Sequence, residues 1–128
     1  MKVATVLFVL LLGTTAAFAA DVPSYLNALS VKQYAALRNN HGSDLAIKIY
    51  LLGAGNAFML INLKLEDDNM SRLYCQPSTE TVIKADTYRD IVDHTMKQLN
   101  LPAGDATDDD SILDVLLIGL RHTYPCQH

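Results

Sequence analysis

Residues 108–126 read DDDSILDVLLIGLRHTYPC, and this closing stretch decides the fold class. The apolar run that begins at Ile112 is long enough for a helix and lacks the alternation that marks a half-buried strand. Ser111 and the acidic residues before it favour the positive end of a helix dipole, and the basic residues up to His122 suit the negative end. Pro125 then stops the helix. We therefore expect a core helix from Ile112 to about His122.

Cys126 follows this helix directly, and Cys75 is the one other cysteine in the chain. An even cysteine count is typical of a disulfide in a chain that leaves the reducing cytoplasm. A disulfide between Cys75 and Cys126 would close a long loop and so contribute about 4 kcal/mol to the free energy of unfolding. The sequence therefore predicts a Cys75–Cys126 disulfide, with two free thiols as the alternative.

Three further segments favour helices, over residues 30–39, 44–65 and 83–99. The first is weakly amphipathic, and the third has apolar residues at helical spacing and is expected to end at Pro102 and Gly104. No segment has the alternation of a strand. The expected fold is all-α, a small bundle of about four helices stapled by one disulfide.

The helix over residues 44–65 is unusually apolar, yet it contains Asn56, Asn62 and two glycines. Its apolar core is too short and too polar for a membrane span, which indicates a buried central helix. Gly53 and Gly55 are expected to permit close packing of a neighbouring helix. They also resemble part of a dinucleotide-binding loop, but the third glycine and the βαβ frame are missing.

The first residues have the pattern of an export signal. Lys2 precedes an apolar run, and Ala17-Phe18-Ala19 matches the small-residue site that a signal peptidase cleaves. The run is too short for a membrane anchor. We expect cleavage between Ala19 and Ala20, so that residues 1–19 are a signal peptide, residues 20–128 are one helical domain and the protein is periplasmic.

Composition limits the partners. The formal net charge is −4, and no basic cluster stands out along the chain. Nucleic acids and anionic membranes both require a basic surface, so we expect neither as a partner. Half of the residues are hydrophobic, which favours a compact domain over disorder.

The sequence contains few groups in a catalytic or metal-binding pattern. His122, Cys126 and His128 lie close together, and Cys75 with His94 is a conceivable nucleophilic pair, but both arrangements need a free cysteine. The acidic run that begins at Asp105 lacks the glycine and the bidentate acid of a calcium loop. We expect no enzyme activity, no cofactor and no metal.

Asn69-Met70-Ser71 fits a glycosylation acceptor, which matters only in a eukaryotic secretory pathway.

The chain has a Cys-x-Pro at Cys75-Gln76-Pro77 and closes in Tyr124-Pro125-Cys126. In these motifs, and over roughly residues 46–126, it resembles the Rap/Tai-type immunity proteins of Gram-negative bacteria. Further matches are Tyr50 to Gly53 with Ala57, the helix from Ile91 to Leu99 before Pro102, and the apolar helix from Ile112 to Leu120. The chain departs from several relatives because its first helix has no cysteine, which leaves out one additional bridge.

The resemblance implies a helical, non-enzymatic inhibitor in the periplasm. Such proteins bind peptidoglycan amidases delivered by type VI secretion, some by inserting a loop into the active-site cleft, and they are often homodimers. The polar segment from Ala103 to Asp109 is our candidate for that loop, because its acidic groups can meet cationic groups in a cleft. The candidate contact residues are Asp105, Thr107, Asp108 and Asp109.

The alternative function is a small periplasmic acid-stress chaperone of the HdeA-like kind. Such proteins are also short, exported, helical and closed by one disulfide. The chain has 14 acidic residues, and their protonation at low pH would loosen the structure and expose apolar surface.

Overall fold

The computed structural model describes residues 28–77, 82–101 and 110–127, and within these ranges the chain is helical. In chain order the elements are α1 (Val31–Arg38), the short 3-10 helix η2 (His41–Ser43), α2 (Asp44–Asp67), α3 (Ala85–Gln98) and α4 (Ile112–Thr123). Across these ranges no strand forms, and an isolated bridge joins Ser30 to Ser111. The prediction of a small all-α bundle is confirmed, with helix bounds within a few residues of those expected.

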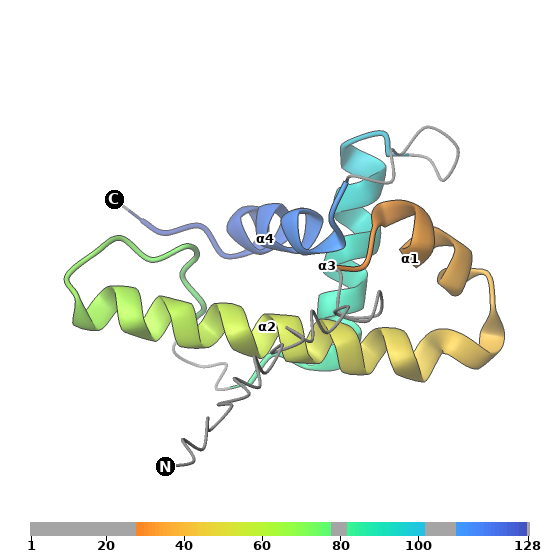
Figure 1. The fold of residues 1–128 in the computed structure, drawn as a ribbon. Coiled ribbons are helices and arrows are strands. Elements are labelled where there is room, and N and C mark those ends of the chain that lie inside the picture. The colour runs from red at the N-terminus through yellow and green to blue at the C-terminus, as the bar shows by residue number, and fades with distance from the viewer. Residues whose placement is uncertain (1–27, 78–81, 102–109, 128) are drawn as a thin grey trace, which may run out of the picture.

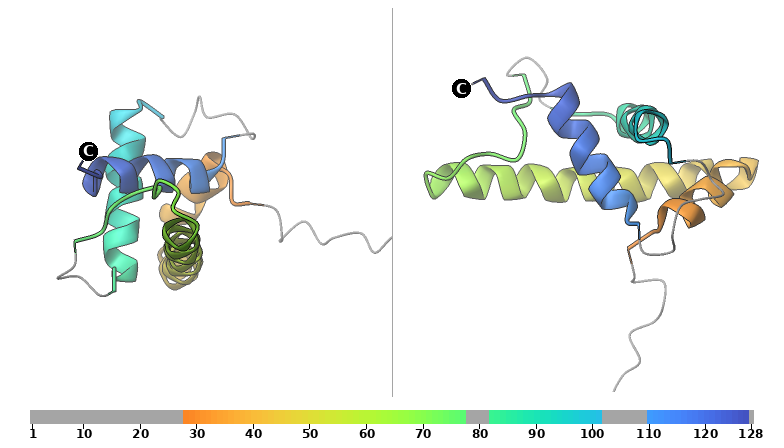
Figure 2. Two further views of the ribbon diagram at one scale, coloured as in Figure 1. Left: turned by 90° about the vertical axis from the view of Figure 1, so that its left-hand side faces the viewer. Right: turned by 90° about the horizontal axis from the view of Figure 1, so that it is seen from above.

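Helix α3 is the centre of the bundle, since it packs against both α2 and α4. In Figure 1, α2 runs along the lower side of the fold, α4 lies above it and α3 stands upright across both. Seen along α2 in Figure 2, left, α3 flanks one side of that helix and α4 lies above it. The short α1 packs near the start of α2. The bundle is therefore built on one side of its longest helix.

The starts of α1 and α4 are capped and tied together. At α1, Ser30 and Gln33 form a capping box through hydrogen bonds of 3.2 and 3.0 Å, and the Ser111 side chain caps α4. Between the two helices the backbone N–H of Val31 donates to the carbonyl of Asp110 at 2.8 Å. These bonds satisfy N–H groups that a helix start leaves without partners.

Asparagine ends both α2 and α3. Asn69 and Asn100 have φ angles of 55° and 49°, the left-handed conformation that terminates a helix. After Asn100, the N–H of Leu101 donates back to the carbonyl of Met96 at 3.0 Å, which closes a Schellman motif. Helix α3 therefore ends at Gln98, and the left-handed Asn100 turns the chain away from it. Residues 102–104, which were expected to end the helix, lie outside the described residues.

The core is aliphatic with four buried tyrosines. Tyr34, Tyr74 and Tyr88 are each at most 2 % exposed, and Tyr124 is 9 % exposed. The aliphatic part comes from all four α-helices and from Ile83, with Val31, Ile47, Leu51, Ile91, Val92, Ile112, Val115, Leu116 and Leu120. The apolar run of α4 lies in this core, as its sequence predicts.

The expectation that α2 is a buried helix is wrong for half of its surface. Ile47 and Leu51 are buried, but Leu45 and Ile49 on the other face are 68 % and 62 % exposed. The segment His41–Asp67 is long and apolar enough to cross a membrane by length and composition alone, and 17 % of its most apolar window is buried. One helix of this kind is weak evidence by itself, so this finding does not place α2 in a membrane.

The two glycines of α2 differ in the same way. A Cβ atom on Gly55 would lie 2.1 Å from Cζ of Tyr88, so only glycine lets α3 approach this closely. A Cβ on Gly53 would meet nothing within 4 Å. The expected close packing is therefore confirmed at Gly55 and wrong at Gly53 within the described part of this chain.

Candidate functional site

Cys75 and Cys126 form the predicted disulfide. Their sulfur atoms are 2.09 Å apart and their Cα atoms 4.8 Å apart, across 51 positions of sequence. The backbone N–H of Cys75 also donates to the carbonyl of Tyr124 at 2.8 Å. The alternative of two free thiols is wrong, and neither sulfur is available as a nucleophile or metal ligand.

Helix α2 fixes the approach to this bridge through one buried side chain. The Asn62 amide nitrogen donates to the carbonyl of Tyr74 at 2.9 Å, and its oxygen accepts from the N–H of Leu73 at 2.7 Å. The loop before Cys75 is therefore held by the inner face of α2 and by a covalent bond to the end of α4.

Three tyrosines pack around the same region. The rings of Tyr74 and Tyr124 lie 6.4 Å apart, and the Tyr88 ring covers Gly55. Burial, assisted by the two neighbouring tyrosines, raises the pKa of Tyr88 to about 12. The Tyr74 hydroxyl is buried and has no hydrogen-bond partner among the residues that the structure describes. The hydroxyls of Tyr74 and Tyr88, whose pKa values are raised by burial, stay protonated at neutral pH, so they support packing rather than proton transfer.

The predicted contact residues Asp105, Thr107, Asp108 and Asp109 lie outside the described residues. The two ends of their segment are described. Leu101 belongs to the Schellman motif at the end of α3, and the Asp110 carbonyl accepts from the N–H of Val31. The segment between these points therefore starts and finishes on fixed backbone.

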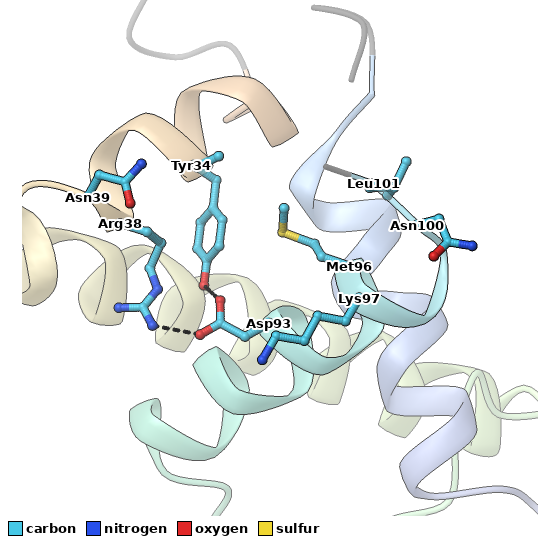
Figure 3. A pocket seen from close by; sticks show the side chains of 9 residues that line it. Tyr34, Arg38, Asn39, Asp93, Met96, Lys97, Asn100 and Leu101 are labelled. Atoms are coloured by element: carbon cyan, nitrogen blue, oxygen red, sulfur yellow. Dashed lines mark hydrogen bonds and ion pairs between the residues drawn. The ribbon is translucent and has the colours of Figure 1, made fainter. Parts of the chain in front are cut away.

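Next to Leu101, α1 and α3 enclose an open groove of about 560 Å³ (Figure 3). The side chains of Tyr34, Met96 and Leu101 give it an apolar lining, and Lys97 adds positive charge, since Arg38 is paired with Asp93. The remaining lining residues are Ala35, Asn39, Asp93 and Asn100. An apolar lining with a cationic group suits a peptide segment or small molecule with an anionic group.

Asp93 holds the two walls of this groove together. Its carboxylate accepts from the Tyr34 hydroxyl at 2.7 Å and from the Arg38 guanidinium at 2.7 Å, as Figure 3 shows. Burial and the hydrogen bond to Asp93 raise the pKa of Tyr34 well above its usual value. Tyr34 is therefore a neutral donor, and Asp93 is a compensated acceptor rather than a free base.

A chain of ion pairs continues from the groove to the start of α2. Asp44 contacts Lys48 at 2.8 Å and Arg89 at 3.0 Å, and Asp86 contacts Lys48 at 2.9 Å. The hydrogen bond from Lys48, followed by that from Arg89, lowers the pKa of Asp44. Arg38 of α1 joins these ion pairs through Asp44, at 3.8 Å. We call Arg38, Asp44, Lys48, Asp86 and Arg89 the charged corner. Because its residues come from α1, α2 and α3, the charged corner fixes the geometry of the helices around the groove.

Sequence reasoning missed Tyr34, Arg38 and Asp93 as a group. Tyr34 and Arg38 are four positions apart and share a helix face, which was a usable signal. Asp93 lies 59 positions from Tyr34, and no local pattern indicates that it faces the other two. Across residues 28–77, 82–101 and 110–127, no group of three or more histidine, cysteine or acidic residues is placed to hold a metal.

Comparisons with protein-family models, with curated proteins and with solved structures find no match for this chain. The function must therefore be argued from the residues and the geometry described above.

Proposed function

We propose that this chain is a periplasmic immunity protein that binds and inhibits a peptidoglycan amidase. One observation carries most of the argument. The Cys-x-Pro at Cys75 and the Tyr-Pro-Cys that ends at Cys126, on which the family resemblance rests, form one unit through the disulfide and the hydrogen bond from Cys75 to Tyr124. Two motifs far apart in the sequence thus come together in one structural unit, which supports the proposal that they belong to one family pattern.

Inhibition by occlusion of the amidase cleft agrees with the anchoring of the acidic segment. A loop whose ends are fixed loses less conformational entropy when it binds, and three aspartates within residues 103–109 suit a cationic cleft. The groove of α1 and α3 adjoins one of these ends at Leu101. A partner that contacts the loop can therefore also reach the groove.

The role is tested in cells that direct the amidase to their own periplasm. The gene for this amidase is sought next to the gene for this chain. We expect the full chain to protect such cells and a version without residues 1–19 to give no protection, because it stays in the cytoplasm. A catalytically inactive amidase controls for toxicity of the export itself. Equal lysis with and without the full chain would contradict the proposal.

The contact is tested by removing three charges from the loop. We expect Asp105→Asn, Asp108→Asn and Asp109→Asn together to weaken inhibition of the purified amidase at least about tenfold, mainly through slower association. The matched control removes three charges at the end of α2, by Glu66→Gln, Asp67→Asn and Asp68→Asn, and should leave inhibition unchanged. Equal potency of the two variants would remove the loop from the contact.

The charged corner is the observation that favours the alternative, an acid-stress chaperone. The pKa of Asp44 is lowered in the fold, so its stabilising contribution is present above the pKa of an unfolded aspartate and is lost as pH falls through the folded value. The contacts among α1, α2 and α3 should therefore loosen in strong acid. Suppression of client aggregation at about pH 2–3, without amidase inhibition at neutral pH, would favour this function.

A further inference from the structure

Three polar residues of the groove between α1 and α3 are not used by the fold. In Figure 3, Asn39 lies on the α1 side of the groove, and Lys97 and Asn100 lie on the α3 side. All three are exposed, and none of their side chains forms a hydrogen bond or ion pair with another residue that the structure describes. The groove therefore offers polar groups to a ligand.

The middle of the groove is apolar. Ala35, Met96 and Leu101 line it and are partly exposed, and Tyr34, which is 1 % exposed, lies beneath them. A methionine side chain is flexible and polarizable, so it adapts to apolar groups of different shape. The volume of about 560 Å³ is within the range of about 300–1,000 Å³ that is typical of ligand sites. We therefore expect the groove to accept an aliphatic side chain.

The two asparagines favour a peptide over a small molecule. A primary amide contains both donors and an acceptor, so it can bond the C=O and the N–H of a peptide unit. Asn39 and Asn100 provide one such amide on each side of the groove. Sites for small molecules bury most of the ligand, whereas this groove is open to solvent.

The uncompensated charge of the groove is positive. Arg38 is paired with Asp93 at 2.7 Å, and the Tyr34 hydroxyl donates to the same carboxylate. Among the described lining residues, Lys97 is then the charged one without a partner, although the whole chain has a net charge of −4. An exposed ammonium group attracts a carboxylate, most strongly at low salt. The groove therefore favours an acidic peptide.

The backbone around the groove favours a carboxylate from a side chain over one from the end of a peptide. Proteins that capture a C-terminal carboxylate use clusters of free backbone N–H groups. This groove is lined by the last turns of α1 and α3, where the free backbone groups are carbonyls. The N–H groups of Asn100 and Leu101 already donate to carbonyls of α3.

The geometry of an extended peptide sets the spacing of these groups. Its side chains alternate in direction, so residues two positions apart point the same way. We propose that the groove binds an extended segment of another protein, in which an aliphatic residue lies two positions from an aspartate or glutamate. The aliphatic side chain packs on Met96 and Leu101, and the carboxylate pairs with Lys97. The amides of Asn39 and Asn100 bond the peptide backbone.

The first test measures binding of the blocked peptide acetyl-Gly-Ser-Leu-Ser-Glu-Ser-Gly-amide, which has this spacing. The isotope-labelled full chain, as processed by the expressing cell, is titrated by NMR at low salt. We expect a Kd on the order of 0.1–1 mM, with signal shifts centred on Met96 and Leu101. Lysine in place of glutamate in the peptide should weaken binding about fivefold. Absence of binding up to about 10 mM peptide would overturn the proposal.

The second test exchanges the charges. Lys97→Glu should reverse the preference, so that the lysine peptide binds about fivefold more tightly than the glutamate peptide. Lys97→Gln should bring the two affinities within about twofold. Lys84→Glu, before the start of α3, is the matched control and should keep the preference of the parent chain. A Lys97→Glu variant that still prefers the glutamate peptide would contradict the proposed pairing.

The third test removes the asparagine amides. Asn39→Ala and Asn100→Gly should each weaken both peptides about two- to fivefold, because each variant loses a hydrogen bond to the peptide backbone. Glycine is the suitable replacement at Asn100, since it adopts the φ of 49° without strain. Unchanged affinity in both variants would refute the backbone contact and overturn the proposal.

Two further ligands separate the alternatives. The first is the peptide with glutamine in place of glutamate and a free C-terminus. If it binds as tightly as the glutamate peptide, the groove recognises chain ends. The second is octanoate, and if it shifts the same signals at lower concentration than the peptide, the groove is a site for small amphiphilic anions. Either result would overturn the proposal. These measurements contain no amidase, so they are independent of the function proposed above.

Discussion

The two faces of α2 have similar composition and different surroundings. Each face has a glycine and an asparagine among aliphatic residues: Gly55 and Asn62 on the inner face, Gly53 and Asn56 on the outer face. The inner glycine lies under a tyrosine ring, and the inner asparagine holds a loop through two hydrogen bonds. Among the residues that the structure describes, the outer pair meets no such neighbours. Residue type alone therefore does not identify the structural role, and the neighbouring element decides it.

The largest expected difference between the faces is at Gly55. Gly55→Ala places a methyl group 2.1 Å from the Tyr88 ring, and neither the α2 backbone nor the buried ring can move without disturbing the core. We expect a loss of about 3 kcal/mol or more in the free energy of unfolding. Urea denaturation checks this value. A loss below about 1 kcal/mol would mean that α3 packs less closely on α2 than described.

The asparagines provide the next comparison. Asn62→Ala leaves the carbonyl of Tyr74 and the N–H of Leu73 without their partner, which should cost about 2 kcal/mol. Asn56→Ala is the matched control on the outer face and should change the unfolding free energy by less than about 0.5 kcal/mol under dilute conditions. Equal effects at the two positions would refute the distinction between the faces.

Alkaline titration tests the tyrosine that covers the inner face. The pKa of Tyr88 is raised to about 12, so the protonated form contributes stability that is fully present below the unfolded pKa of 10 and is lost as pH rises through 12. We expect a decline of about 2 kcal/mol over this range. Tyr88→Phe removes this titration, so its stability should fall less steeply with pH. Tyrosinate absorbance, measured in parallel, should show one late-ionising tyrosine fewer in Tyr88→Phe than in the parent chain, because the pKa values of Tyr34 and Tyr74 are raised in both.

The smallest expected effect is at Gly53, and its sign is opposite to that at Gly55. Gly53→Ala meets open space and improves helix propensity, so the unfolding free energy should rise by about 0.5–1 kcal/mol. The measurement is made at chain concentrations that keep the protein monomeric, so that it reports on the helix and not on an interface. Destabilisation under these conditions would show that a neighbour covers Gly53.

The helices and the disulfide are predictable from the sequence because their signals are local. Ser111 is a helix cap in the sequence and in the structure, and the apolar run of α4 is a core helix. The end of α3 is less predictable, since Asn100 adopts a left-handed conformation that asparagine shares with few other residues. In the sequence, Pro102 and Gly104 are the stronger helix-ending signals, and both follow Asn100.

The exposure of α2 is not predictable from its own pattern. A helix that is apolar on most sides has weak periodicity, so the sequence does not indicate which face the bundle covers. The groove cannot be predicted from the sequence either. Asp93 contacts Tyr34 only because α3 packs beside α1 in the folded chain. The acidic segment at residues 103–109 remains a prediction from composition, supported by the anchoring of its two ends.

The most direct test of the central claim is a titration of the amidase with this protein. Peptidoglycan hydrolysis is measured as the purified chain is added to a fixed concentration of the enzyme from the neighbouring gene. If the chain is an immunity protein, activity should fall linearly to a few per cent at about one chain per enzyme, as expected for binding with a Kd in the nanomolar range. Full activity at about a tenfold molar excess of correctly disulfide-bonded protein would contradict the claim.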